Sequence, residues 1–302
     1  MNPGCLSGAD QAVRTAIISD IHANVFALKA VLEDIESKDV QRIVCLGDII
    51  GYGPDPIECV DLVQDRCALT LLGNHDFACR TEPVNFNYMA RDAALWTQDR
   101  LELAHPDEAA RDRRLDFLDS LPVRRMLNDD PRFLCVHGSS RHPTNEYVFP
   151  DDGFSVERMK PLFDRFEAVC FEGHTHWPGI FVSEPREDGD PVFSFYRGLC
   201  SEGRQGSFST GTMAGIDRIV LRLSEGAKYI VNPGSVGQPR DGDSWASWSV
   251  LETSDDDATD PVLTFHRTNY DWMRVRERIE QFRREGDERL DPFLGERLGM
   301  GR

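Results

Sequence analysis

The sequence lacks any apolar stretch near the ~18 residues that a membrane-spanning helix needs. Its first dozen residues also lack the basic segment followed by an apolar segment that marks a secretory signal. We therefore expect a soluble, cytoplasmic protein that has no membrane partner.

Basic residues are scarce in this chain. The 302 residues include 34 lysines and arginines against 52 acidic residues, which gives a formal net charge of -18. Such a charge repels nucleic-acid phosphates, so non-specific nucleic-acid binding is excluded as a function. A small phosphorylated substrate remains compatible with the composition, because bound divalent cations can reverse the field locally.

Paired cysteine motifs are also missing. The eight cysteines include no C-x-x-C pair, and Cys45, Cys135 and Cys170 fall inside predicted buried strands. We interpret these three cysteines as small apolar core residues, not as disulfide partners or ligands of a structural zinc ion.

Polar residues recur at the ends of five predicted strands. The clearest case is RIVCLGD, residues 42–48, a short apolar run that ends in a glycine and Asp48. Parallel sheets present functional side chains at the carboxyl ends of their strands. The other four strand-like segments end in the following residues: Asp20 and His22; Asn74, His75 and Asp76; His137; His174 and His176. Glycines beside four of these ends allow close approach to a shared centre.

The order of predicted elements indicates an α/β protein with a single domain over residues 13–302, after a disordered stretch over 1–12. Residues 13–74 read as strand, helix, strand, helix, strand, which predicts a mostly parallel sheet. Residues of about 77–130 look helical and are expected to overhang the site as a cap. The strand-like segments that follow His176 predict a second, antiparallel or mixed sheet, with an extended β insert at about 181–228.

The strand-end residues form a mixed set of oxygen and imidazole nitrogen donors without thiolates. The set is too large for one ion and suits two divalent cations such as manganese, iron, nickel or zinc. Asp48 is the natural bridge, since its strand lies between two others with polar ends. Any single histidine could be a core residue, but burying all of these groups without metals would cost several kcal/mol.

Other polar residues are interpreted differently. We expect His105, His142 and His266, which lie outside the motifs, to be surface or local structural residues. Asp76 is expected to support loop structure. Arg240, in GQPRDG, is compatible with either a phosphate contact or a structural role in its loop.

Five motifs, DIH, GD, GNHD, VHG and GHTH, occur in the order that resembles the calcineurin-like metallophosphoesterase superfamily. The later NPGSVGQPRDGD and the run from FHRTNYD to PFLGERL resemble a bacterial and archaeal branch with small phosphodiesterase-like members. The resemblance implies a four-layer α-β-β-α sandwich of two mixed sheets flanked by helices. It also implies that one metal is held by Asp20, His22, Asp48 and His176, and the other by Asp48, Asn74, His137 and His174. His75 would be the catalytic histidine, without a metal.

One departure from the resemblance bears on function. Phosphoprotein phosphatases of the superfamily have a GD-x-x-DRG pattern, whereas this chain reads GDIIGYG, with Gly51 and Tyr52 at the aspartate and arginine positions. Our hypothesis is a phosphoesterase that hydrolyses phosphodiester or phosphomonoester bonds by attack of a metal-bound hydroxide. A nucleotide-like small substrate is preferred, and a homo-oligomer is compatible with the sequence. The alternatives are a non-catalytic scaffold with the same fold and a phosphoprotein phosphatase.

Overall fold

Two mixed β-sheets lie face to face in the computed structural model of this chain, which describes residues 12–103, 107–186, 189, 191–200, 215–254, 256 and 259–302. Within these residues, the first sheet has the order β10 (Arg218–Val220), β13 (Val262–Thr268), β12 (Ala246–Thr253), β1 (Val13–Ile18), β2 (Arg42–Cys45) and β3 (Leu69–Thr70). The second has the order β4 (Arg124–Met126), β5 (Phe133–Val136), β6 (Val169–Phe171), β11 (Lys228–Asn232), β7 (Gly179–Glu184), β8 (Val192–Gly198) and β9 (Gly215–Ile216).

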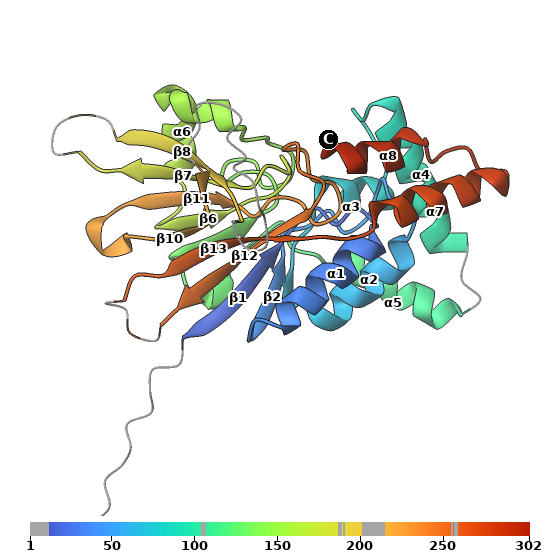
Figure 1. Ribbon diagram of the computed structural model, residues 1–302, viewed down its shortest axis with the longest axis horizontal. Helices are drawn as coiled ribbons and strands as arrows, with labels where there is room; N and C mark the ends of the chain where they lie inside the picture. The colour runs from blue at the N-terminus through green and yellow to red at the C-terminus, as the bar shows by residue number, and fades with distance from the viewer. Residues whose placement is uncertain are drawn as a thin grey trace, which may run out of the picture.

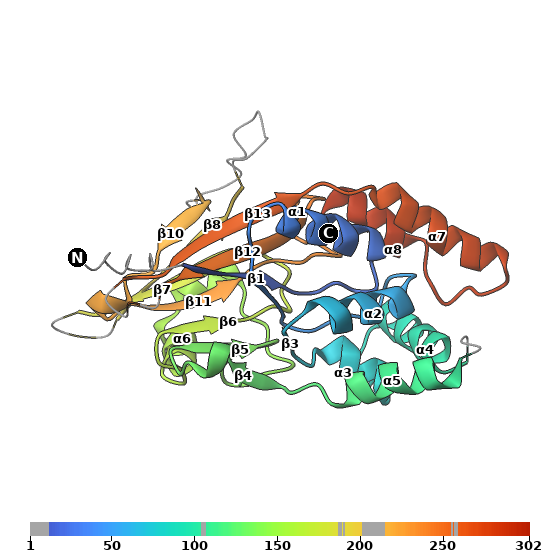
Figure 2. The ribbon, with the colours of Figure 1, turned by 90° about the horizontal axis from the view of Figure 1, so that it is seen from below.

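Helices flank the pair of sheets on both sides. Figures 1 and 2 show α6 (Val156–Phe163) on the strand side of the molecule and the other helices gathered at the opposite end. Those helices are α1 (Val25–Glu36), α2 (Pro56–Arg66), α3 (Asn74–Arg80), α4 (Tyr88–Leu103), α5 (Glu108–Asp119), α7 (Trp272–Arg284) and α8 (Phe293–Glu296). Among the described residues, none of the helices combines the length and apolarity that crossing a bilayer requires.

Three apolar clusters separate the four layers, and the alternation of side chains along the strands explains them. In β1, Ile18 packs toward α1 with Leu28, whereas Ile17 faces the second sheet. In the second sheet, Phe171 faces the first sheet, while its neighbour Cys170 packs toward α6. Because successive side chains of a strand point to opposite faces, each central strand contributes to two clusters. The predicted α-β-β-α sandwich is therefore present.

The assignment of strands to sheets differs from the sequence prediction. The strands after His176 do not make the second sheet alone: β12 pairs antiparallel with β1, and β13 pairs with β12. Strands β5 and β6 pair parallel with each other in the second sheet, where β11 continues the parallel set. The sequence shows each strand but not its partner, since pairing depends on contacts between distant segments.

The predicted helical insert at about 77–130 has different bounds in the structure. Helix α3 already begins at Asn74, and β4 lies inside the predicted range as an edge strand. Helices α4 and α5 pack into the outer helical layer (Figure 2). Within that layer, the Trp96 ring of α4 lies 5.0 Å from the Phe282 ring of α7. In the predicted β insert, β7 to β9 extend the second sheet and β10 extends the first. The division of the chain into domain and inserts stays a prediction.

Two sequence expectations concern residues that the structure largely does not describe, and a third can be checked. The disordered stretch predicted over 1–12 lies almost wholly outside the described residues, and so does His105. Cys45, Cys135 and Cys170 are described, and all three are buried free thiols, as predicted.

Candidate metal centre

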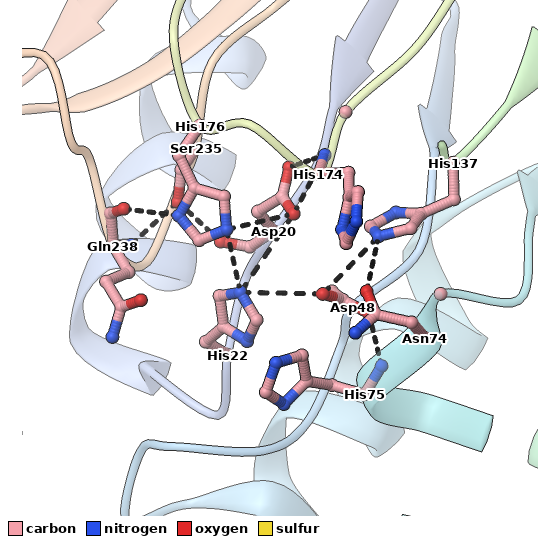
Figure 3. Close-up of polar contacts among 12 residues, drawn as sticks. Asp20, His22, Asp48, Asn74, His75, His137, His174, His176, Ser235 and Gln238 are labelled. Carbon is pink, nitrogen blue, oxygen red and sulfur yellow. Dashed lines mark hydrogen bonds and ion pairs between the residues drawn. The ribbon is translucent and has the colours of Figure 1, made fainter. Parts of the chain in front are cut away.

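The predicted ligands from both sheets meet at one place. Asp20, His22 and Asp48 follow β1 and β2 of the first sheet, Asn74 begins α3, and His137, His174 and His176 follow β5 and β6 of the second. Figure 3 shows their side chains converging, with His75 beside them. The donor atoms form three overlapping groups, each within 4.8 Å: Asp20, His22 and His176; His22, Asp48 and His75; and Asp48, His137 and His174.

Asp48 lies between the two halves of this centre. Its Oδ2 is 3.6 Å from Nε2 of His22 and 3.4 Å from Nε2 of His137, and its Oδ1 accepts a hydrogen bond from the backbone N–H of His75 at 2.8 Å. Asn74 joins the His137 side, where its Oδ1 lies 3.1 Å from Nε2 of that ring. One carboxylate thus faces imidazoles from both sheets, which is the position that a bridging ligand would take.

Backbone carbonyls orient three of the imidazole rings. Nδ1 of His22 lies 3.4 Å from the carbonyl oxygen of Ile50. The corresponding distances are 3.1 Å between Nδ1 of His137 and the carbonyl oxygen of Leu46, and 2.6 Å between Nδ1 of His176 and that of Gln238. A carbonyl only accepts hydrogen bonds, so each of these Nδ1 atoms carries a hydrogen. Burial lowers the pKa of His22 and His176, so both rings are neutral and their Nε2 atoms present lone pairs. This arrangement is typical of histidines that bind metal through Nε2.

The donor set fits metal cations. Nε2 of His22 and Nε2 of His176 lie only 3.1 Å apart, both as lone-pair acceptors, and Asp20 Oδ1 is 3.3 Å from the latter. Nε2 of His174 is buried and has no hydrogen-bond partner within the described part of the chain. Converging acceptors without a donor are unfavourable unless a cation lies among them. The structure therefore brings together clusters of aspartate and histidine that are able to bind metal ions.

The backbone of the site is held in an uncommon conformation. Five predicted ligands have positive φ angles between 49° and 65°, namely Asp20, His22, Asp48, His174 and His176. Left-handed backbone at a residue other than glycine costs on the order of 1–3 kcal/mol and concentrates at functional sites. The surrounding structure must therefore supply the hydrogen bonds and packing that hold these loops.

Asp76 supplies part of that support, as the sequence predicted. Its carboxylate accepts hydrogen bonds from the backbone N–H groups of Gly73, Asp48, Ile49 and Ile50, at 2.8 to 3.2 Å. The approach is close enough that a Cβ atom at Gly73 would lie 2.0 Å from Oδ1 of Asp48. Asp76 thus fixes the loop that presents Asp48.

The charges of the site favour ionised carboxylates beside mostly neutral rings. Burial opposes ionisation of Asp48, but His137 and the other nearby histidines lower its pKa well below the usual range. Burial lowers the pKa of His22, and it lowers that of His174 to about 3. Burial also lowers the pKa of His137, but Asp48, together with Asp20 and Asp76, raises it to about 9, so this ring must release its Nε2 hydrogen to bind a cation. Ionised carboxylates and neutral imidazoles are the forms that bind cations.

His75 is oriented by aromatic packing and by a glycine. The ring centroids of Tyr52 and Phe86 lie 4.4 Å and 4.7 Å from that of His75. Gly51 makes room for the ring, since a Cβ atom there would lie 2.7 Å from Nδ1 of His75, and its φ of +86° suits glycine. Burial lowers the pKa of His75 to about 4. Gly51 and Tyr52 therefore orient His75, which the sequence alone did not reveal.

A cavity of about 500 Å³ opens beside the centre. Asn74, His75 and His174 form its inner end, and its outer walls come mainly from the connection between α3 and α4. Tyr147 forms another wall: its ring stacks on His174 with centroids 3.7 Å apart and an interplanar angle of 19°. The lining also includes Asn85, Asn87 and Asn145, and Oδ1 of Asn87 accepts a hydrogen bond from the backbone N–H of Ala90 at 3.0 Å. The cavity combines flat aromatic faces with hydrogen-bonding edges.

Residues outside the motifs have the other roles that the sequence suggested. His142 is exposed and belongs to none of the donor groups among the described residues, while the buried His266 ring stacks on Trp248 at 4.5 Å. Sequence reasoning missed the carbonyl of Gln238 and the ring of Tyr147. The first lies in the conspicuous run NPGSVGQPRDGD, whereas the second has no sequence signal of its own.

Comparison with known proteins agrees with this geometry. The sequence profile named calcineurin-like phosphoesterase matches residues 13–178. The uncharacterized protein MJ0912 of Methanocaldococcus jannaschii is 35% identical over 291 residues, which cover 95% of this chain and 98% of that protein. The crystal structure of a metallophosphoesterase from Sphaerobacter thermophilus is 35% identical, with a TM-score of 0.68 and coverage of 97% and 100%. The hypothetical protein PH1004 of Pyrococcus horikoshii OT3, 16% identical with a TM-score of 0.60 and coverage of 92% and 96%, shares the fold.

Proposed function

Because the chain belongs to the calcineurin-like phosphoesterase family, we propose that it hydrolyses phosphoric esters with two divalent metal ions. Manganese, iron, nickel and zinc suit the mixed oxygen and nitrogen donors. When bound, such ions offset charge on the phosphoryl oxygens and lower the pKa of water toward neutrality. One ion would be held by Asp20, His22, Asp48 and His176, and the other by Asp48, Asn74, His137 and His174.

The position of Asp48 is the observation on which this proposal mainly rests. One oxygen of its carboxylate lies 3.6 Å from His22 and 3.4 Å from His137, two rings that belong to different sheets. A carboxylate that faces two separate sets of lone-pair donors suits a shared ligand of two cations. A structural histidine cluster would instead satisfy its ring nitrogens internally, and His174 does not do so.

His75 is proposed to act on the phosphoryl group. In the reaction, oxygen from water forms a bond to phosphorus, the bond from phosphorus to the ester oxygen breaks, and the leaving oxygen takes up a proton. The ring of His75 lies in the cavity beside Asn74, and its own backbone N–H is anchored to Asp48. From there it would either protonate the leaving oxygen or donate a hydrogen bond to the phosphoryl oxygens.

The shape of the cavity supports a small, nucleotide-like substrate. Besides stacking on His174, the Tyr147 ring lies parallel to that of Phe149, with centroids 5.4 Å apart and an interplanar angle of 8°. The aromatic surface of this wall could receive a flat heteroaromatic ring, because base stacking on aromatic side chains contributes ~1–3 kcal/mol. The amides of Asn85, Asn87 and Asn145 could bind its polar edges. Both diesters and monoesters would fit this description, and small esters are favoured over phosphoproteins.

The test is metal-dependent hydrolysis. Protein stripped with a chelator and reloaded with Mn²⁺ should release nitrophenolate from bis(4-nitrophenyl) phosphate, whereas stripped protein should not. His137→Ala should lose this activity. His142→Ala is the control, since this exposed histidine lies outside the donor groups, and it should retain the activity.

The scaffold alternative makes the opposite prediction. If folded protein that binds metal releases no nitrophenolate with manganese, iron, nickel or zinc, and none from a panel of nucleotides and phosphopeptides, the proposed activity is wrong. The chain would then be a non-catalytic member of its family.

A further inference from the structure

Two arginines from distant parts of the sequence lie at the edge of the metal centre. Arg240 follows β11 by a short loop, and its backbone N–H points to the carbonyl oxygen of His176 at 3.5 Å. Its Nη2 donates a hydrogen bond to Oε1 of Gln238 at 2.8 Å. The carbonyl of Gln238 is the group that orients His176, so Arg240 belongs to the same loop that supports this predicted ligand.

Arg297 comes from the short helical turn Arg297–Met300 near the C-terminal end of the described chain. Its guanidinium carbon lies 5.7 Å from the ring centre of Tyr52, whose ring is 4.4 Å from that of His75. The N–H of Gly242 donates to the carbonyl of Gly301 at 3.0 Å, which ties this turn to the loop of Arg240. Figures 1 and 2 show the C-terminal segment folded back beside α8, near the middle of the molecule.

Neither guanidinium group pairs with an acidic side chain among the described residues. In the part of the chain that the structure describes, neither Arg240 nor Arg297 forms an ion pair with the side chain of an aspartate or a glutamate, although acidic residues outnumber basic ones 52 to 34. Nε of Arg240 is buried without a hydrogen-bond partner, and Nε of Arg297 donates only to the backbone oxygen of Arg302 at 2.6 Å. Burial and then the charge of Arg240 lower the pKa of Arg297 to about 10.

The nearest acid of the same loop is engaged elsewhere. Asp241, directly after Arg240, is buried and binds both Arg197, at 2.9 Å, and Arg267. These two ion pairs fix the loop while leaving the charge of Arg240 uncompensated. The hydrogen bond between Gly242 and Gly301 joins the segments of the two arginines, and burial and the charge of Arg240 both lower the pKa of Arg297. Two like charges in a partly buried place are unfavourable by themselves, and an anion bound by both would offset their repulsion.

We propose that Arg240 and Arg297 bind a second phosphate group of the substrate, so that the chain acts on small molecules with at least two phosphates. Nucleoside diphosphates and dinucleoside polyphosphates are substrates of this class. Guanidinium groups suit such a group because their planar N–H pairs match phosphate oxygens. The ring of Tyr52 contacts both Arg297 and His75. Arg297 would therefore contact a phosphate next to the reacting one, and not the reacting phosphate itself. This inference rests on the proposed phosphoesterase function.

The test compares two anions on manganese-loaded protein by titration calorimetry. Inorganic phosphate occupies one phosphate position, whereas pyrophosphate spans two. Wild-type protein should bind pyrophosphate more tightly, and Arg297→Gln should reduce pyrophosphate affinity by roughly 10-fold or more, as expected for a lost charge-assisted hydrogen bond, while phosphate affinity changes by less than about 2-fold. Arg240→Gln should behave similarly, and Arg297→Lys should fall between wild type and Arg297→Gln.

Arg222→Gln is the matched control, because this exposed arginine pairs with Glu225 after β10, far from α8 in Figure 1. It should leave both affinities unchanged. Equal losses for both anions in the Arg297 variants, or no loss in any variant that folds as judged by circular dichroism, would overturn the inference. The outcomes separate the two proposals: hydrolysis without a pyrophosphate effect overturns only the inference, whereas a pyrophosphate effect without hydrolysis of any ester overturns the proposed function.

Discussion

Nε2 of His22 and Nε2 of His176 face each other at 3.1 Å, although the Nδ1 atom of each ring is directed at a backbone carbonyl. Both Nε2 atoms are therefore lone-pair acceptors, and nothing in their own chemistry holds them together. The two loops nevertheless adopt left-handed backbone at both residues to create this contact. Such a costly arrangement is understandable if a cation binds between the rings.

Asp48→Asn should weaken both metal sites together, because the lost charge serves each ion. Metal analysis after dialysis should show well below the expected two ions per chain, while circular dichroism still shows a folded protein. Asp119→Asn, which changes a carboxylate paired with Arg80 on the surface, is a suitable control and should retain the metals. Retention of both ions by Asp48→Asn would mean that another residue is the bridge.

His75→Asn should leave metal content and fold near wild type while the hydrolysis rate falls by roughly 10² to 10⁴. If His75 protonates the leaving oxygen, nitrophenyl esters should suffer less than alkyl esters, since nitrophenolate needs little protonation. Equal losses for both would indicate stabilisation of the phosphoryl oxygens instead. His142→Asn is the control. Loss of metal from the His75 variant would show that this residue is a ligand.

Asp76→Asn should destabilise the protein through the loop of Asp48. Its carboxylate accepts hydrogen bonds from four backbone N–H groups, and an amide would turn a donor toward some of them. We expect a loss of about 2–4 kcal/mol in the free energy of unfolding of metal-free protein, measured with urea. The exposed ion pair of Asp119 should contribute under about 1 kcal/mol by the same measurement. Similar losses for both variants would contradict the role assigned to Asp76.

Tyr147→Leu should discriminate between substrates. For a nucleoside 4-nitrophenyl phosphate, KM should rise roughly 10-fold with little change in kcat, because the stacking face is lost. For methyl 4-nitrophenyl phosphate, which has no base, both constants should stay near wild type. Phe154→Leu changes a ring that is 80% exposed and outside the cavity, so it serves as the control. A parallel change for both esters would argue against a base-stacking role.

The sequence by itself determined the strands and the residues at their ends. The run RIVC followed by Gly47 and Asp48 predicts a buried strand and a polar end from local pattern alone, and the structure has β2 there. The same reasoning placed Asp20, Asn74, His137 and His176 at strand or loop positions that the structure brings together. It also assigned Asp76 to the loop. These features are local, because apolar runs, glycines and polar ends act within a few residues.

Only the tertiary structure decided which sheet each strand joins and what surrounds His75. Strand β12 pairs with β1 across more than two hundred residues, and β5 and β6 belong to the sheet opposite β1. A single sequence contains no local signal for such pairing, since it depends on which apolar faces can be buried together. The space that Gly51 leaves for His75, the stacking of Tyr147 on His174 and the approach of Arg297 to Tyr52 arise only when those distant segments pack against one another.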